Sequence, residues 1–243
     1  MTFAPPPMFR TLGAIMPKGL QPRPGARRSS NAAKPPLPRE LLDEIRRTAR
    51  PTDQEVAIAK LSRAVDLLER GDAKVAVVEA LEAKAAAPRS VAVREVLGLA
   101  LYGAGRWKEA AAELKAYRRM SGSADQNHVL ADCLRALGKP SEAIPLAEEE
   151  LRSKAPNEAK AEAVIVAASA LADQQRYPEA LAFLGRAKTR EDVSEPYTLR
   201  LWYVRGDILA RAGRREEAAE EFRKVMRHDS SAFDAAERLA ELS

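Results

Sequence analysis

A glycine that is followed five residues later by an alanine recurs along most of this chain. The pairs are Gly71 with Ala76, Gly105 with Ala110, Gly138 with Ala143, and Gly213 with Ala218, and Gln175 takes the glycine position before Ala180. Successive alanines of this series stand 34, 33, 37 and 38 residues apart. Self-similarity at such a period is typical of a solenoid of helical hairpins, in which each hairpin packs on the next. The sequence therefore predicts an all-α, right-handed solenoid.

Residues 91–114 form the clearest copy of the repeat and read as a helix, a tight turn and a second helix. Gly98 and Ala110 are small enough for the two helices to approach closely, and Leu97 and Leu114 fill the space around that contact. Only 5% of the residues are aromatic, and alanine and leucine supply much of the apolar character. This composition favours helices over a sheet, which would require more β-branched and aromatic residues.

The repeats resemble tetratricopeptide repeats, whose pattern is W-x2-L-G-x2-Y, then A-x3-F, then P. The second repeat matches it at Arg94, Leu97, Gly98, Leu101, Ala110 and Leu114. The fifth matches it at Trp202, Arg205, Gly206, Leu209, Ala218 and Phe222. Leu or Ala replaces most of the aromatic residues of the pattern. Over its body the chain is also similar to tetratricopeptide proteins of high-GC bacteria.

The predicted organisation is a tail followed by one repeat domain. Residues 1–38 contain nine of the sixteen prolines, and proline lacks the N–H that helices and sheets need, so we expect a disordered tail. Residues 39–243 form the predicted solenoid, with repeats near 57–90, 91–123, 124–160, 161–198 and 199–232. Residues 39–50 and 232–242 are expected to be capping helices, because the end of a solenoid has to be covered. The extra residues of the longer third and fourth repeats fall near 151–158 and 190–196.

The positive charge is concentrated in the tail. The first 39 residues contain no acid and seven bases, which are Arg10, Lys18, Arg23, Arg27, Arg28, Lys34 and Arg39. The net charge of the chain is +5, so residues 40–243 carry 5 − 7 = −2. A basic, proline-rich tail can contact the phosphates of a nucleic acid, and it can equally serve as a solubilising linker.

Candidate chemistry in the body is sparse. His128 and Asp132 share a helix face at i and i+4, but a metal site needs three or four ligands, so no metal is expected. Cys133 is predicted to be buried and inert. No phosphate-binding loop is present, and we expect neither a cofactor nor catalytic residues. The prolines near the N-terminus interrupt any signal peptide, and the longest apolar run, residues 163–172, is too short to span a bilayer. These features predict a cytoplasmic protein.

The resemblance implies that the first helix of each repeat lines a concave groove, where defined positions touch a partner. Those positions hold Glu95, Tyr102, Asp125, His128, Asp132, Arg135, Glu162, Ser169, Asp173, Arg200, Tyr203, Asp207 and Arg211. Tyr102 and Tyr203 are the expected anchors, as exposed aromatic residues. The chaperone-binding members of the family hold a peptide carboxylate with Lys, Asn and Arg, but Leu61, Val65 and Val96 occupy three of those places here.

The function predicted from the sequence is therefore a non-catalytic interaction module that binds a peptide or protein segment in its groove. The alternative is a factor that associates with nucleic acid or the ribosome, in which the tail contacts phosphates and the solenoid contacts protein.

Overall fold

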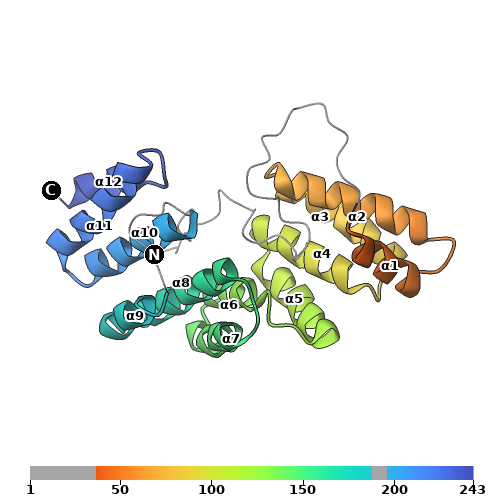
Figure 1. Ribbon diagram of the computed structural model, residues 1–243, viewed down its shortest axis with the longest axis horizontal. Helices are drawn as coiled ribbons and strands as arrows, with labels where there is room; N and C mark the ends of the chain where they lie inside the picture. The colour runs from red at the N-terminus through yellow and green to blue at the C-terminus, as the bar shows by residue number, and fades with distance from the viewer. Residues whose placement is uncertain (1–36, 188–195, 243) are drawn as a thin grey trace. The chain divides into compact units, whose positions relative to one another are not determined.

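The computed structural model describes residues 37–187 and 196–242, and in these ranges every regular element is a helix (Figure 1). The chain divides into two compact units at the Ser123–Ala124 bond. We call residues 37–123 the first unit and residues 124–242 the second unit. The predicted all-α, tetratricopeptide-like fold is confirmed for the described residues.

The first unit contains a short leading helix and two hairpins. Helix α1 (Arg39–Thr48) packs against α2 (Gln54–Glu69) and α4 (Val91–Gly103). Helix α2 forms a hairpin with α3 (Ala73–Ala86), and α4 forms one with α5 (Trp107–Ser121). Glu44 of α1 accepts hydrogen bonds from Ser90 Oγ (2.6 Å) and Val91 N (2.8 Å). A carboxylate is favourable there because the first N–H groups of a helix lack partners and carry partial positive charge.

The second unit contains three hairpins and a closing helix. The hairpins pair α6 (Asn127–Ala136) with α7 (Pro140–Arg152), α8 (Asn157–Asp173) with α9 (Tyr177–Leu184), and α10 (Pro196–Arg211) with α11 (Arg215–His228). Helix α12 (Ala235–Glu241) packs against α11 and lies within the predicted capping segment 232–242.

The turn of every hairpin requires a left-handed backbone conformation. Gly71, Gly105, Gly138 and Gly213 have φ between 74° and 84°, a region that costs glycine little and other residues more. Gln175, which replaces glycine in the fourth repeat, adopts the same conformation with φ of 61°. The position within the repeat therefore determines the backbone conformation of Gln175, even though glutamine is unfavourable in that conformation.

Two glycines allow close helix contacts at equivalent places in the two units. A Cβ atom on Gly98 of α4 would lie 2.8 Å from Leu114 of α5. A Cβ atom on Gly206 of α10 would lie 2.9 Å from the ring of Phe222 in α11. Both distances are shorter than van der Waals contact, so only glycine fits at these crossings.

Two predicted features fall outside the described residues. They are the tail, except for its last residues, and most of the segment 190–196 between the fourth and fifth repeats. Arg39, the last of the seven tail bases, begins α1 and lies 3.9 Å from Asp43 at the protein surface. The division into a tail and a repeat domain, with the repeat bounds given above, stays a prediction.

Candidate functional site: the charged first-helix layer of the second unit

The first helices of the three hairpins in the second unit lie side by side. Helix α8 packs against both α6 and α10, while α7, α9 and α11 pack behind them. We call the layer formed by α6, α8 and α10 the first-helix layer. Eleven of the thirteen predicted groove residues lie in or directly before these helices, whereas Glu95 and Tyr102 belong to α4 of the first unit.

Arg135 of α6 joins two helices of this layer. Its Nε donates to Asp132 Oδ1 at 2.8 Å, and its Nη1 donates to Asp173 Oδ2 of α8 at 2.9 Å. The Arg135 side chain is only 2% exposed. Burial lowers the pKa of its guanidinium, but Asp132 and Asp173 raise it by more, so Arg135 stays charged.

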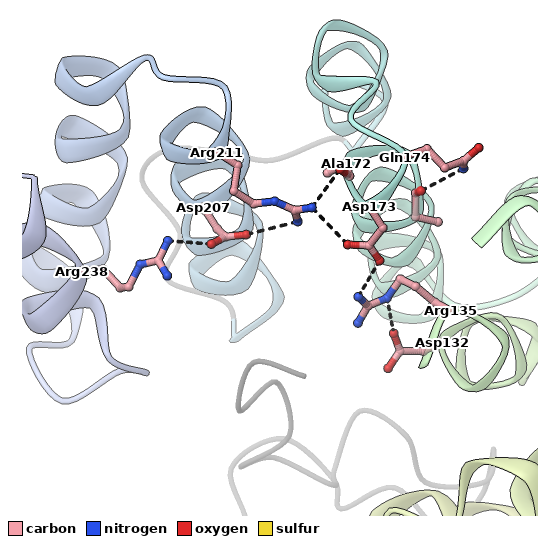
Figure 2. Close-up of polar contacts among 9 residues, drawn as sticks. Asp132, Arg135, Ala172, Asp173, Gln174, Asp207, Arg211 and Arg238 are labelled. Atoms are coloured by element: carbon pink, nitrogen blue, oxygen red, sulfur yellow. Dashed lines mark hydrogen bonds and ion pairs between the residues drawn. The ribbon is translucent and has the colours of Figure 1, made fainter. Parts of the chain in front are cut away.

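The contacts continue from α8 to α10 and α12 (Figure 2). Arg211 of α10 donates to Asp173 Oδ1 at 3.2 Å and to the carbonyl oxygen of Ala172 at 2.8 Å. Asp207 lies 3.8 Å from Arg211 and accepts a 2.7 Å hydrogen bond from Arg238 of α12. We call Asp132, Arg135, Asp173, Arg211, Asp207 and Arg238 the charged row.

The charged row becomes more open to solvent toward α12. The Asp132 and Arg135 side chains are nearly inaccessible, Asp173 is 15% exposed, and Asp207, Arg238 and Arg211 are between 26% and 30% exposed. The contact of Arg211 with Ala172 also places a cation at the C-terminus of α8, where the helix dipole favours it. The outer half of the row therefore presents ordered charges that a partner can reach.

A second polar cluster lies deeper in the unit and is centred on His128. Its Nδ1 lies 2.8 Å from Glu150 Oε1, and its backbone N–H donates to Glu150 Oε2 at 2.6 Å. Glu150 comes from α7 and is fully buried. Burial lowers the pKa of His128, but the Glu150 charge, its hydrogen bond and the Glu162 charge raise it by more, and the net pKa lies above its ordinary value.

Glu162 of α8 and Arg200 of α10 form a buried ion pair beside His128. Arg200 Nη2 lies 2.7 Å from Glu162 Oε2, and the two side chains are 4% and 2% exposed. Burial raises the pKa of Glu162, and Arg200 and His128 only partly offset that rise. Within the described part of the chain, Glu162 Oε1 and His128 Nε2 are buried without a hydrogen-bond partner.

The structure corrects the expectation that Tyr102 and Tyr203 are exposed. Tyr102 is 1% exposed, and its ring packs edge-on against Trp107. Tyr203 is 5% exposed, its ring contacts Phe222 and Phe233, and its hydroxyl donates to Asp234. Burial and the Asp234 carboxylate raise the pKa of Tyr203. Both rings are packing residues in this structure.

The repeat pattern does not point to the partners that organise this layer from outside it. Glu150 lies on a second helix, and Arg238 and Asp234 lie at the closing helix, so none of them occupies a groove position of the repeat. The sequence does hold a signal for Glu150. This acid follows the buried Ala143 and Ala147 at the spacing of one helix face, and that face points into the core. A buried acid requires a cationic or hydrogen-bonding partner.

Other candidate chemistry is limited in the described residues. They contain no group of three or more His, Cys, Asp or Glu that could hold a metal. Cys133 is buried as predicted, and burial raises the pKa of its thiol. None of the described helices combines the length and apolarity that a membrane crossing needs.

Comparison with known proteins identifies the class. The tetratricopeptide repeat family model matches residues 47–125 and 128–196, which is more than half of the chain, and the chain belongs to that family. No curated protein matches its sequence.

Three solved structures share the fold. YrrB, a tetratricopeptide protein described as having an unusual peptide-binding site, is 20% identical with a TM-score of 0.51 over 74% of this chain and 90% of its own. The MamA RS-1 ArsTM double mutant is 18% identical with a TM-score of 0.55, over 72% of this chain and 98% of its own. A Podosopora anserina chain described as a kinesin light chain with nearly identical repeats is 18% identical with a TM-score of 0.54, over 72% of this chain and 96% of its own.

Proposed function

We propose that the chain is a non-catalytic interaction module that binds an extended peptide or protein segment on the first-helix layer of its second unit. The charged row carries this proposal. It places carboxylates and guanidiniums alternately across neighbouring helices and holds each in a fixed position. A surface ordered before binding loses little side-chain entropy when a partner arrives. The peptide-binding site of YrrB, on a similar fold, is consistent with this function.

The outer members of the row define what such a segment must offer. These members are Arg211, Asp207 and Arg238, which are partly exposed and already paired with one another. When a segment binds, each can exchange its present partner for a charge of the segment and so remain paired. A segment that carries both a basic and an acidic side chain can replace both contacts. In an extended chain, alternate side chains point to one face about 6–7 Å apart, which suits recognition of a row of charges.

The test uses peptides selected from a random library against the full chain. Their affinities for the wild-type protein and for Arg211→Gln are measured by fluorescence anisotropy, and we expect Arg211→Gln to bind at least tenfold more weakly. Arg211→Lys, which retains the charge, should recover part of the affinity. Arg214→Gln is the matched control, because Arg214 also pairs with an acid, Glu217, but lies at the N-terminal cap of α11, behind the first-helix layer. Equal affinities for wild type and Arg211→Gln would contradict the proposal.

The alternative function rests on the seven bases of residues 1–39, because no acid accompanies them. In that case the tail would contact a nucleic acid or the ribosome, and the affinity would fall steeply with salt concentration. Removal of residues 1–38 would abolish such binding and leave selected peptides bound by the second unit. A cytoplasmic location and an origin in high-GC bacteria stay predictions of the sequence.

A further inference from the structure

One face of α3 in the first unit is apolar and open to solvent. Val75, Val78 and Leu81 are 49%, 54% and 43% exposed, and Val78 has the largest exposed fraction of any large apolar side chain in the described residues. Single exposed apolar residues are ordinary on protein surfaces. Three that share one helix face form a patch, and such patches mark interaction sites.

The exposed residues of α3 follow the spacing of a helix–helix seam. They recur at intervals of one and three residues and are Lys74, Val75, Val78, Leu81, Glu82 and Ala85. Positions spaced in this way lie along one side of a helix and pack against a second helix in coiled coils. Helix α3 already packs against α2 and α4 through Ala76, Val77, Ala80 and Ala83, which are buried. The seam is therefore an additional face.

This seam is complementary to itself. If two copies of α3 pack antiparallel about a two-fold axis at Val78, residues equally far from Val78 in opposite directions face each other. Lys74, four residues before Val78, then faces Glu82 of the second copy, and Val75 faces Leu81 of the second copy. Each Lys74–Glu82 contact lies about 6 Å along the helix from the axis, since a helix rises 1.5 Å per residue. A two-fold dimer requires this kind of self-complementary patch.

The two charged residues are available for such contacts. Among the described residues, none forms an ion pair with Lys74. Glu82 lies 2.8 Å from Lys60, but its side chain remains 52% exposed, and Lys60 keeps a second partner in Glu79 at 3.0 Å. Glu82 can therefore bind Lys74 of a second copy without leaving Lys60 unpaired.

We propose that α3 is a dimerisation surface, on which a second copy of this chain packs antiparallel about a two-fold axis at Val78. The contact is one helix on one helix, and so it buries less area than the interfaces of stable complexes. The expected dimer is reversible, with a Kd on the order of 10 μM.

Sedimentation equilibrium of the full chain over about 1–500 μM tests this proposal. We expect wild type to change from monomer to dimer, and Val78→Lys to raise the Kd at least tenfold. Lys74→Glu alone and Glu82→Lys alone should each weaken the dimer, since each places like charges face to face at two points. The double variant Lys74→Glu with Glu82→Lys restores opposite charges and should restore most of the affinity.

Val56→Lys is the matched control, because Val56 is 51% exposed in the same hairpin but lies on α2. Circular dichroism melting confirms that each variant is folded. A chain that stays monomeric over the whole range overturns the proposal, and so does equal weakening by Val56→Lys and Val78→Lys. Failure of the double variant to recover affinity overturns the two-fold arrangement at Val78.

Discussion

The two compact units use the same helical hairpin but stabilise its first helices by different chemistry. In the first unit, the first helices α2 and α4 bury apolar residues such as Leu61, Val65 and Val96, and α1 packs against both helices. In the second unit, charged residues join α6, α8 and α10 through Arg135, Asp173 and Arg211. The repeat pattern therefore determines the hairpin but does not determine whether its first helix is joined to its neighbours by apolar or by charged residues.

Under the proposed function, this difference gives the two units separate roles. An apolar layer has to be covered to be stable, and α1 contributes that cover in the first unit. The charged row in the second unit is held by its own ion pairs and remains compatible with water, so it can present polar groups to a partner. Ion pairs of this kind add specificity more than net stability, since desolvation costs offset much of the attraction.

The largest expected effect comes from removing the centre of the charged row. Arg135→Leu leaves the Asp132 and Asp173 carboxylates facing an apolar side chain, and we expect it to lower the free energy of unfolding by about 3–5 kcal/mol. Urea denaturation followed by circular dichroism measures the loss. Arg214→Leu, at an exposed ion pair beside the start of α11, should change stability little. Equal losses in the two variants would show that the row does not stabilise the second unit.

A smaller effect is expected where the two units are alike. Gly98→Leu inserts side-chain atoms where Leu114 already lies, and overpacking of this kind costs about 1–3 kcal/mol. Gly206→Leu should cost a similar amount against Phe222, since the crossing is equivalent. Ala112→Leu adds apolar atoms at an exposed position of α5 and serves as the control in the same urea assay. Unchanged stability of Gly98→Leu would mean that the phase of the repeat is misassigned.

The smallest expected effect is a pH dependence confined to the second unit. The pKa of His128 is raised above 6.5, so the native state binds its proton more tightly than the unfolded chain does. The resulting stabilisation is fully present below pH 6.5 and is lost as the pH rises through the native pKa. The raised pKa values of Glu150 and Glu162 act in the same direction at lower pH.

NMR titration of the imidazoles and urea unfolding at several pH values measure this effect. In Glu150→Gln the pKa of His128 should fall, because the carboxylate that opposes burial is gone, and stability should decline less above pH 6.5. A His128 titration that does not move in Glu150→Gln would contradict this assignment.

Much of the fold could be predicted from the sequence because its strongest signals are local. A turn glycine and the alanine five residues later both reflect constraints within one hairpin. The repeat phase also located Gln175 at a turn position, although glutamine rarely adopts a positive φ. The two short contacts of Gly98 and Gly206 follow from the same pattern.

The site was harder to predict because its contacts cross from one hairpin to another. Arg135 and Asp173 are 38 residues apart, and the repeat places both on first helices without determining whether they meet. Glu150 was missed because it reaches His128 from a second helix. Tyr203 was predicted to be exposed because the repeat pattern does not include Phe233 and Asp234, which cover its ring and bind its hydroxyl.

Shared partners in the charged row also have a consequence for how the second unit unfolds. In a solenoid, hairpins can separate one at a time when the coupling between neighbours is weak. Asp173 binds both Arg135 and Arg211, so detachment of either neighbouring hairpin removes one of the two cations that pair with this partly buried carboxylate of α8. A partly opened second unit, in which one hairpin has detached, is therefore disfavoured relative to the fully packed and the fully unfolded states. The three hairpins are expected to melt as one cooperative block.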